Sequence, residues 1–408
     1  MPALTKRALL AATLLAGVWP ACSAFAADPD PANWKSVLSA AKGQTVSFNA
    51  WGGEPRINAY IAWAGTEVEK RFGVKLAHVK LADTAEAVQR VLADKTAGAN
   101  EGGAVDLILI NGENFAAMKK NGLLFGPWAD KTPNFALTDP ERNKDITADF
   151  TVPIDGFESP WGRAQVVFYH DMDTLAVPPK SMNGLLAWSK ANPGRFAYPQ
   201  PPDFLGLTFL KQALLELATD KAPLYSPVEN AEFDAVTKPL WDYLDQLHPA
   251  LWRQGRAFPA NSTELRRAFA DKETRIGFTF NPGDASAAIA NNEFPPSVES
   301  YVLDAGTIGN VHFLAIPYNA ANKAGAMVLA NFLLSPEAQA KKLDPAVWGD
   351  QTVLSIALLP EKEQALFEKI DLGSATLRPQ ELGTPLPEPH PSWLTAIEAA
   401  WKTRYGAQ

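Results

Sequence analysis

Hydrophobic positions near the start of the chain follow two spacings, which predict a strand and then a helix. The run TVSFNAW, residues 45–51, is rich in β-prone side chains and stops at a pair of glycines. The next apolar positions, from Ile57 to Phe72, lie three and four residues apart, which places them on one helical face. Pro55 suits the first turn of this helix, and Gly73 suits its end.

The alternation of strand and helix continues beyond this pair. Strands are expected at residues 74–81 and 105–110, with a helix at 84–95 between them. The run VDLILI, residues 105–110, is continuously apolar, as in a strand buried on both faces of a parallel sheet. A short helix capped by Asn114 and ended by Gly122 should follow. This pattern predicts an α/β domain with a largely parallel sheet.

The rest of the chain repeats the pattern with different turns. Further strands are expected at residues 164–171, 194–199, 274–283 and 311–317, and further helices at 181–190, 207–218, 236–246, 261–271, 321–334, 335–342 and 392–405. The strand at 311–317 should return to the first sheet. The proline-rich segment at 377–391 should wrap the surface before the last helix.

The first 27 residues have the features of a secretory signal peptide. Two basic residues precede an apolar run from Ala8 to Val18, and an Ala-x-Ala pattern ends at Ala26. The run is too short to cross a bilayer. Cys22, the only cysteine, follows WPA rather than a sequence like the LAG of a lipid attachment site. We therefore expect ordinary cleavage and a periplasmic chain instead of a lipid anchor at Cys22.

Removal of this leader changes the charge and the available chemistry. The mature chain would hold 35 basic and 45 acidic residues, a formal charge of −10. Such acidity argues against nucleic acid or an anionic membrane as a main partner. Without Cys22 the mature chain has no thiol, which excludes disulfides and thiolate metal sites. The mature chain of about 380 residues is longer than a single hydrophobic core usually supports, so two domains are expected.

Polar and glycine residues gather in loops that follow the expected strands. In open parallel sheets, ligands bind beyond the carboxyl ends of strands, where loops meet helix N-termini. The candidate ligand-binding residues in these loops are Trp51, Gly52, Gly53, Glu54, Arg56, Asn111, Glu113, Asn114, Asn281 and Asp284. Trp51 offers a flat stacking surface, and the glycines let backbone approach a ligand closely.

Each of these loops also has a purely structural interpretation. A Gly-Gly-x-Pro corner is what any tight turn from strand to helix needs, and Trp51 can fill the space beneath it. Asn114 has a sufficient role as a helix cap, and the sequence NPGD at residues 281–284 is an ordinary turn. Both interpretations stay open at this point.

The segment GTIGNVHFLAIPYNAANKAGAMVLANFLLSPEAQA, residues 306–340, resembles the extracellular solute-binding proteins of ABC importers. The shared features are the strand ending in IP, the alanine-rich helix and the motif FLLSPEAQ. The segments WGGEPRINAYIAW, PDFLGLTFL and GTIGN further resemble the YnjB-type subgroup. Together the similar segments span roughly residues 45–349.

This resemblance implies a fold class and a domain organisation. The implied fold is α/β, a two-lobe type II periplasmic binding protein fold with a hinge and an interlobe ligand cleft. The chain would cross between lobes near residues 156–163 and 300–306. Lobe one would comprise residues 28–158 plus 306–342, and lobe two residues 159–305 plus 343–408.

The implied cleft adds aromatic and cationic candidates. Trp161 and Arg163 lie at the first expected crossing, where they would face both lobes, and Tyr198 follows in lobe two. A planar ring can stack on a sugar face, an aromatic ring or a cation. These three residues complete the expected ligand-binding set.

The resemblance also implies a function. The chain would capture a small organic solute, and would deliver it to an ABC permease in the inner membrane. A thiamine-like compound, a polyamine and a carbohydrate all stay open as solutes, because aromatic rings and carboxylates suit each of them. A monomer is expected, with no cofactor, no metal site and no nucleic-acid partner.

The sequence gives little support to two other classes of protein. A ferric-ion carrier would need clustered tyrosines, but the eight tyrosines include no adjacent pair near the carboxyl-terminal half. A secreted hydrolase lacks support, because the sequence contains no Gly-x-Ser-x-Gly, His-Glu-x-x-His or phosphate-loop motif. The one close group of histidine and carboxylates, at residues 170–173, lacks further metal ligands. An enzyme is therefore not expected.

Overall fold

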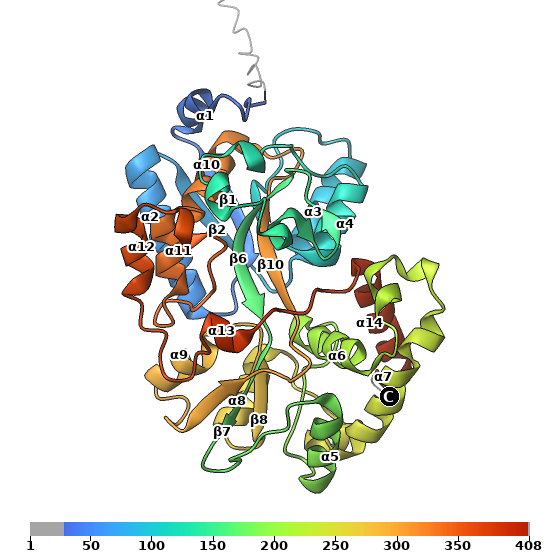
Figure 1. The fold of residues 1–408 in the computed structure, drawn as a ribbon. Coiled ribbons are helices and arrows are strands. Elements are labelled where there is room, and N and C mark those ends of the chain that lie inside the picture. The colour runs from blue at the N-terminus through green and yellow to red at the C-terminus, as the bar shows by residue number, and fades with distance from the viewer. Residues whose placement is uncertain (1–27, 407–408) are drawn as a thin grey trace, which may run out of the picture.

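A computed structural model describes residues 28–406, and the expected signal peptide at residues 1–27 lies outside the described part. Two sheets divide the described chain into two lobes, drawn one above the other in Figure 1. None of the helices in the described residues is long and apolar enough to cross a membrane.

The strands and helices have the following bounds. The strands are β1 (Thr45–Trp51), β2 (Lys75–Leu81), β3 (Leu107–Ile110), β4 (Ala148–Asp149), β5 (Val152–Pro153), β6 (Glu158–Gln165), β7 (Val167–Asp171), β8 (Ile276–Thr279), β9 (Val298–Tyr301) and β10 (Gly309–Ala315). The helices are α1 (Trp34–Ala41), α2 (Pro55–Phe72), α3 (Ala85–Thr96), α4 (Gly112–Lys120), α5 (Met182–Ala191), α6 (Phe204–Leu217), α7 (Phe233–Leu247), α8 (Ser262–Ala270), α9 (Asp284–Ala290), α10 (Lys323–Leu333), α11 (Pro336–Leu343), α12 (Glu361–Glu368), α13 (Pro379–Leu382) and α14 (Pro391–Tyr405).

The first lobe is built on a five-stranded sheet with the order β2-β1-β3-β10-β6. β1 runs parallel to β2 and β3, whereas β10 is antiparallel to both β3 and β6. One face of the sheet packs against α1, α2 and α10. The other face packs against α3 and α4. Both faces are covered, which explains the continuous apolar run in β3.

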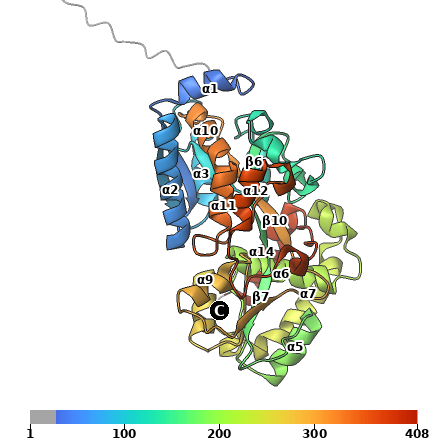
Figure 2. The ribbon, with the colours of Figure 1, turned by 60° about the vertical axis from the view of Figure 1, so that its left-hand side comes forward.

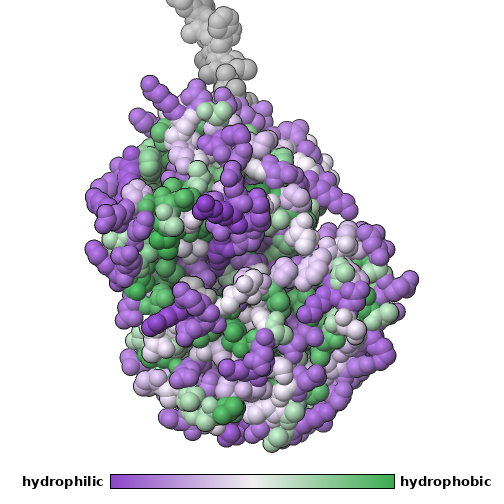
Figure 3. Space-filling view, in the orientation of Figure 1, coloured by the Kyte–Doolittle hydropathy of each residue, from purple (hydrophilic) through white to green (hydrophobic). Residues whose placement is uncertain are grey.

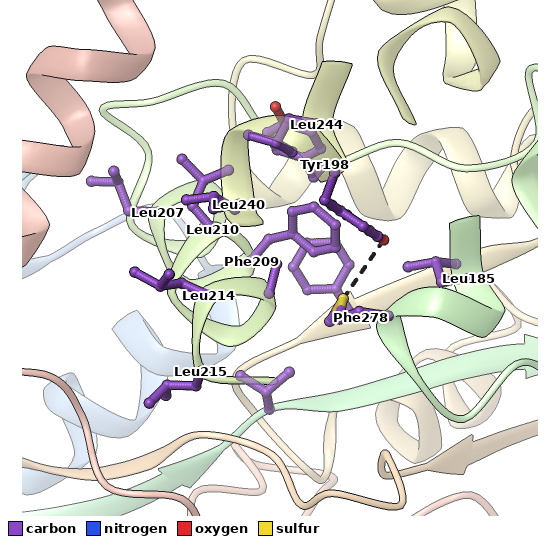
Figure 4. Packing of buried hydrophobic residues seen from close by; sticks show 14 of the residues in the cluster. Leu185, Tyr198, Leu207, Phe209, Leu210, Leu214, Leu215, Leu240, Leu244 and Phe278 are labelled. Carbon is purple, nitrogen blue, oxygen red and sulfur yellow. Dashed lines mark hydrogen bonds between the residues drawn. The ribbon is translucent and has the colours of Figure 1, made fainter. Parts of the chain in front are cut away.

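The second lobe is built on a three-stranded antiparallel sheet with the order β8-β7-β9. Its largest core is formed by α5, α6, α7 and α14 packed on this sheet. Figure 4 shows this core, with Tyr198 lying against Phe209 and leucines of α6 and α7 around them. A smaller cluster under α9 completes the lobe.

Backbone pairing joins the lobes at a narrow neck. The strand that leaves the first sheet at Gln165 enters the second sheet at Val167, and the return passage lies between β9 and β10. The backbone N–H of Val166 donates to the carbonyl of Ile308 at 2.8 Å, which ties the two passages together. The neck is thus close to the two expected crossings.

Most elements expected from the hydrophobic spacing are confirmed. α2 begins at Pro55, and Gly73 ends it with a φ of 69°. The expected strand at residues 164–171 is divided between β6 and β7, because the chain changes sheets within it. β10 lies in the first sheet, as expected.

Two local predictions were wrong. Residues 194–199 form no strand, because their backbone pairs with the segment at residues 250–252, where the Gly194 N–H donates to the Ala250 carbonyl and the Phe196 carbonyl accepts from the Trp252 N–H. Asn114 does not cap its helix, since α4 begins at Gly112 and Asn111 occupies the cap position. Gly112 has a φ of 60°, and an added Cβ would lie 2.9 Å from the Phe150 ring.

The carboxyl-terminal part of the chain packs on both lobes. Val353 and Phe367 share a buried cluster with Phe313 of the first sheet, whereas Trp393 and Trp401 lie in the core of the second lobe. The sequence-based division places all of residues 343–408 in lobe two. We propose instead that the first lobe continues to the end of α12, because the apolar side chains there are buried against the first sheet.

Residues 371–390, which we call the strap, then cross from the first lobe to the second over the neck, on the face seen in Figure 1. The backbone N–H of Leu386 donates to the carbonyl of Thr307, and the N–H of Gly309 donates to the carbonyl of Leu386. A Cβ on Gly309 would lie 2.5 Å from Pro385, so only glycine lets the strap lie this close. The strap includes nearly all of the proline-rich segment, residues 377–391, that the sequence analysis expects to wrap the surface.

Replacement of Trp161 tests the core of the first lobe. Its indole is fully buried and packs against Phe48, Tyr60 and Trp348 at ring centroid distances of 5.2 to 6.4 Å. We expect Trp161→Ala to lower the free energy of unfolding by about 3–5 kcal/mol, because it removes a large buried ring. Urea denaturation measures this loss. A change below about 1 kcal/mol would contradict the placement of this ring in the core.

Candidate functional site

A cluster of charged residues joins the lobes at one side of their boundary. Glu54 and Arg56 stand at the start of α2 in the first lobe, while Arg266 of α8 and Asp284 of α9 belong to the second lobe. Figures 1 and 2 both show α9 below α2. We call these four residues the clasp.

The contacts of the clasp link both lobes directly. Asp284 Oδ1 lies 2.9 Å from Arg266 Nη1 and 3.5 Å from Arg56 Nη2, and Arg266 Nη1 lies 3.8 Å from Glu54 Oε2. All four side chains are at least three-quarters buried, with exposed fractions between 13% and 25%. Burial raises the pKa of Asp284, and the two arginines oppose this rise. The clasp therefore places opposite charges where the solvent screens them only partly.

Neutral contacts beside the clasp bring the backbones of the two lobes together. The Asn281 side-chain amide donates to the carbonyl of Trp348 at 2.9 Å. A Cβ added to Gly283 would lie 2.8 Å from the Cα of Gly349, so side chains other than glycine would separate the lobes here. Asn281 and Asp284, both expected at a ligand site, therefore serve as interlobe contacts in this structure.

A second interlobe contact lies at the other end of the boundary. Lys211 of α6 places its Nζ 4.8 Å from the Phe150 ring centroid, and Phe150 follows β4 in the first lobe. The same Nζ lies 5.3 Å from the Phe204 ring centroid. Lys211 also forms a 2.6 Å ion pair with Glu388 of the strap, and both side chains are no more than 2% exposed.

Between these two contacts the second lobe presents a row of half-buried groups. Phe280 precedes Asn281, and its ring lies 5.6 Å from that of Phe204 at the start of α6. Asp203 caps α6 by accepting from the backbone N–H groups of Leu205 and Gly206. The row therefore runs from the clasp through two aromatic rings to Lys211.

The first lobe presents acidic and aromatic groups along the same boundary. Trp51 ends β1 half-buried, and an added Cβ on Gly53 would lie 2.5 Å from its indole. Glu113 lies in the first turn of α4 and accepts from the Asn114 side-chain amide at 3.0 Å. Burial raises the pKa of Asp203, and the charge of Asp83 from the first lobe adds to this rise across the boundary.

Three acidic side chains behind this boundary hold oxygens without a hydrogen-bond partner. Asp149 accepts from the Gly112 backbone N–H at 2.7 Å through Oδ2, but its Oδ1 is unpartnered. Glu113 Oε2 and both carboxylate oxygens of Glu158 are buried and unpartnered as well. Burial raises the pKa of Glu113 and raises those of Asp149 and Glu158 well above their usual range.

Three candidate residues do not reach this boundary. Trp161 lies in the core of the first lobe, where its indole packs among Phe48, Tyr60, Trp348 and His312. Tyr198 lies in the core of the second lobe and hydrogen-bonds His248 Nε2 at 2.7 Å. The expectation that these two rings face a cleft was wrong, because each strand or loop turns its aromatic side chain inward.

Arg163 belongs to the first lobe alone. Its guanidinium pairs with Asp145, and its backbone N–H donates to the carbonyl of Gln351 at 3.0 Å. Both partners lie in segments that pack on the first sheet. Both interactions of Arg163 therefore stay within the first lobe.

Several residues at the boundary were not singled out from the sequence. They are Asp83, Phe150, Asp203, Phe204, Lys211, Arg266, Phe280 and Glu388. Asp203 and Phe204 lie within the loop QPPDF, residues 200–204, and Phe280 directly precedes the loop NPGDA, residues 281–285. Each loop leads into a helix N-terminus, and that signal could have found these three residues. Lys211 and Glu388 are 177 positions apart, and no local pattern connects them.

The described residues contain no group of three or more histidine, cysteine or acidic side chains arranged to hold a metal ion. Figure 3 shows a notch in the outline of the molecule between the two lobes on the right-hand side. The arrangement suits non-covalent binding of a small molecule, since it combines aromatic faces, carboxylates and helix N-termini at a boundary between two lobes.

Comparisons with known proteins agree with this description. Residues 63–362 match the family described as bacterial extracellular solute-binding protein. The chain is 43% identical over 384 residues to Protein YnjB of Escherichia coli strain K12. The aligned region covers 94% of this chain and 97% of that protein.

Solved structures share the fold at low sequence identity. The spermidine/putrescine ABC transporter substrate-binding protein PotD of Streptococcus pneumoniae superposes with a TM-score of 0.57 at 16% identity, covering 88% of this chain and 99% of PotD. The periplasmic binding protein AfuA of Actinobacillus pleuropneumoniae, solved with fructose-6-phosphate, gives 0.59 at 15% identity, covering 89% and 98%. The two-lobe fold expected from the sequence is confirmed.

Replacement of Arg56 tests the clasp. We expect Arg56→Gln to increase the radius of gyration of the solute-free protein in small-angle scattering, because the change removes about 1 kcal/mol of contact between the lobes. Arg71→Gln is the matched control, since Arg71 lies on the same helix but pairs with Glu67 and Glu337 within the first lobe. Equal radii for both variants would contradict a role of Arg56 in holding the lobes together.

Replacement of Glu158 tests the buried carboxyl groups. The folded-state pKa of Glu158 is raised above its ordinary value of 4.5, so the folded protein binds the extra proton and loses stability as the pH rises from 4.5 through the raised pKa. We expect Glu158→Gln to stabilise the protein at neutral pH by about 1–3 kcal/mol and to flatten this pH dependence. Thermal unfolding from pH 5 to pH 8 measures both effects. If stability depends on pH in the same way in the variant and the original protein, the raised pKa of Glu158 is refuted.

Proposed function

The chain belongs to the bacterial extracellular solute-binding proteins of ABC importers, and on this premise we propose that it captures a small organic solute between its two lobes. The solute then passes to a permease in the inner membrane. We also propose that residues 1–27 direct export to the periplasm and are removed. Binding and closure need no covalent chemistry, so no catalytic residue is assigned.

One observation supports the position of the proposed site. The two interlobe contacts, the clasp at one end and the contact of Phe150 with Lys211 at the other, enclose a band of half-buried aromatic and acidic groups. Trp51, Asn111 and Glu113 supply the band from the first lobe, and Phe204 and Phe280 supply it from the second. A solute held there would touch both lobes at once.

The proposed mechanism is closure of the lobes around the solute. A solute that contacts both lobes stabilises the closed arrangement by the difference in its affinity for the closed and open forms. The narrow neck allows rotation because only a few backbone bonds join the lobes there. The closed lobes would then present the surface that the permease recognises.

A ligand screen tests this function. Vitamins, amines, sugars and metal ions are added singly to the mature protein, and the melting temperature is measured, since a ligand that binds only the folded state raises it. A compound that raises the melting temperature should also reduce the radius of gyration and be recovered chemically unchanged. Turnover of the compound, or binding without compaction, would contradict the proposal.

Replacement of Phe204 tests the position of the site. We expect Phe204→Ala to weaken binding of that compound by about tenfold, because half of an aromatic platform is lost. Val177→Ala is the control, since Val177 is 82% exposed. An unchanged affinity in the Phe204 variant would place the solute elsewhere.

A further inference from the structure

We propose that the first lobe contains a subsite for an organic cation, formed by Glu113 and Asp149. This inference rests on the proposed function and specifies the class of solute. Of the classes that the sequence leaves open, it favours amines and other cationic compounds over a neutral carbohydrate.

The subsite is short of hydrogen-bond donors. Asp149 is 1% exposed, and only its Oδ2 has a partner, the Gly112 backbone N–H. Oδ1 of Asp149 and Oε2 of Glu113 are buried and accept from nothing in the described structure. A buried carboxylate oxygen without a donor destabilises the folded protein, so these two positions call for an added donor.

The charges around the subsite indicate that the missing donor is positively charged. After burial, the charge of Glu113 adds to the rise in the pKa of Asp149, and Glu388 adds to the rise in the pKa of both groups. Asp149 in turn adds to the rise in the pKa of Glu158. Lys211 is the cation that acts on these carboxylates, but its Nζ forms its ion pair with Glu388. One ammonium group therefore faces three carboxylates, which leaves negative charge that a solute can compensate.

The position of Lys211 shows that these surroundings accept an ammonium group. Its Nζ lies within 4.8 Å of the Phe150 ring centroid and 5.3 Å of the Phe204 ring centroid, with a carboxylate oxygen at 2.6 Å. Aromatic faces and carboxylates together are the surroundings that bind organic cations in proteins. The same rings lie between the lobes, so a second cation beside Lys211 would be held as the lobes close.

A hydroxyl group of a sugar would also donate to these oxygens, but it would leave their charge in place. Burial raises the pKa of both Glu113 and Asp149, which shows that their charged forms lack compensation. A neutral solute would have to bind these groups in their protonated forms. A cation stabilises the ionised forms and is therefore expected to release protons when it binds.

Three compounds of equal length and different charge test the subsite. All three are four-carbon compounds. Putrescine carries two ammonium groups, γ-aminobutyrate carries one ammonium group and one carboxylate, and succinate carries two carboxylates. In titration calorimetry of the mature protein, putrescine should bind with the highest affinity and γ-aminobutyrate with a lower affinity. Succinate should not bind. Putrescine should release protons into the buffer.

Charge-removing variants complete the test. Glu113→Gln should weaken putrescine binding by about tenfold or more, because the ligand loses its ionised partner. Glu363→Gln, in the first turn of α12, is the matched control and should bind like the original protein. Equal or tighter binding of succinate, no heat with putrescine at millimolar concentration, or unchanged binding in the Glu113 variant would overturn the cation subsite.

Failure of this inference is distinguishable from failure of the proposed function. If a sugar or an anion raises the melting temperature and compacts the protein, the solute-binding function stands and the cation subsite is refuted. If no compound in the screen does so and putrescine gives no heat, both are contradicted.

Discussion

The rest of the structure depends on the backbone pairing at the neck. Val166 and Ile308 hold the two passages between the sheets together, and the strap adds a third passage through Leu386. Gln212 of α6 strengthens the neck, because its side chain accepts from the Ile308 N–H and donates to the Gly306 carbonyl. The other interlobe contacts described above are made by side chains or loops, and such contacts can separate without unfolding either core.

This division of roles explains where charge is placed. Each lobe has its own apolar core, so its stability does not require the boundary to be apolar. The boundary can then carry arginines and carboxylates, which attract across it through a partly buried space. The clasp and the ion pair of Lys211 with Glu388 lie at separate positions along it, and the groups between them have few partners. Residues with unmet hydrogen-bonding capacity at a movable boundary are what a carrier of small solutes needs.

The sequence predicted the elements well where the spacing of apolar residues was regular. α2, β1 and β3 follow from local patterns, because each needs only its own periodicity and its own end signals. The aromatic candidates were less successful. Trp161, Tyr198 and Phe204 all carry aromatic rings, but the first two lie in cores and the third lies at the boundary. The local sequence pattern does not predict which face of a strand or loop points to a core. The loops after β1, β3 and β8 lie at the boundary between the lobes, since the place of a loop that follows a strand depends on the topology of the sheet.

By itself the sequence determined the alternation of strands and helices, the acidic character, the absence of cysteine after residue 22, and the resemblance to a family of solute carriers. Only the tertiary structure decided which groups meet across the boundary. Arg56 and Asp284 are 228 positions apart, and Lys211 and Glu388 are 177 apart. Contacts over such separations depend on how two lobes are placed by a shared neck. Periodicity reports on neighbours along one element, so it carries no information about that placement.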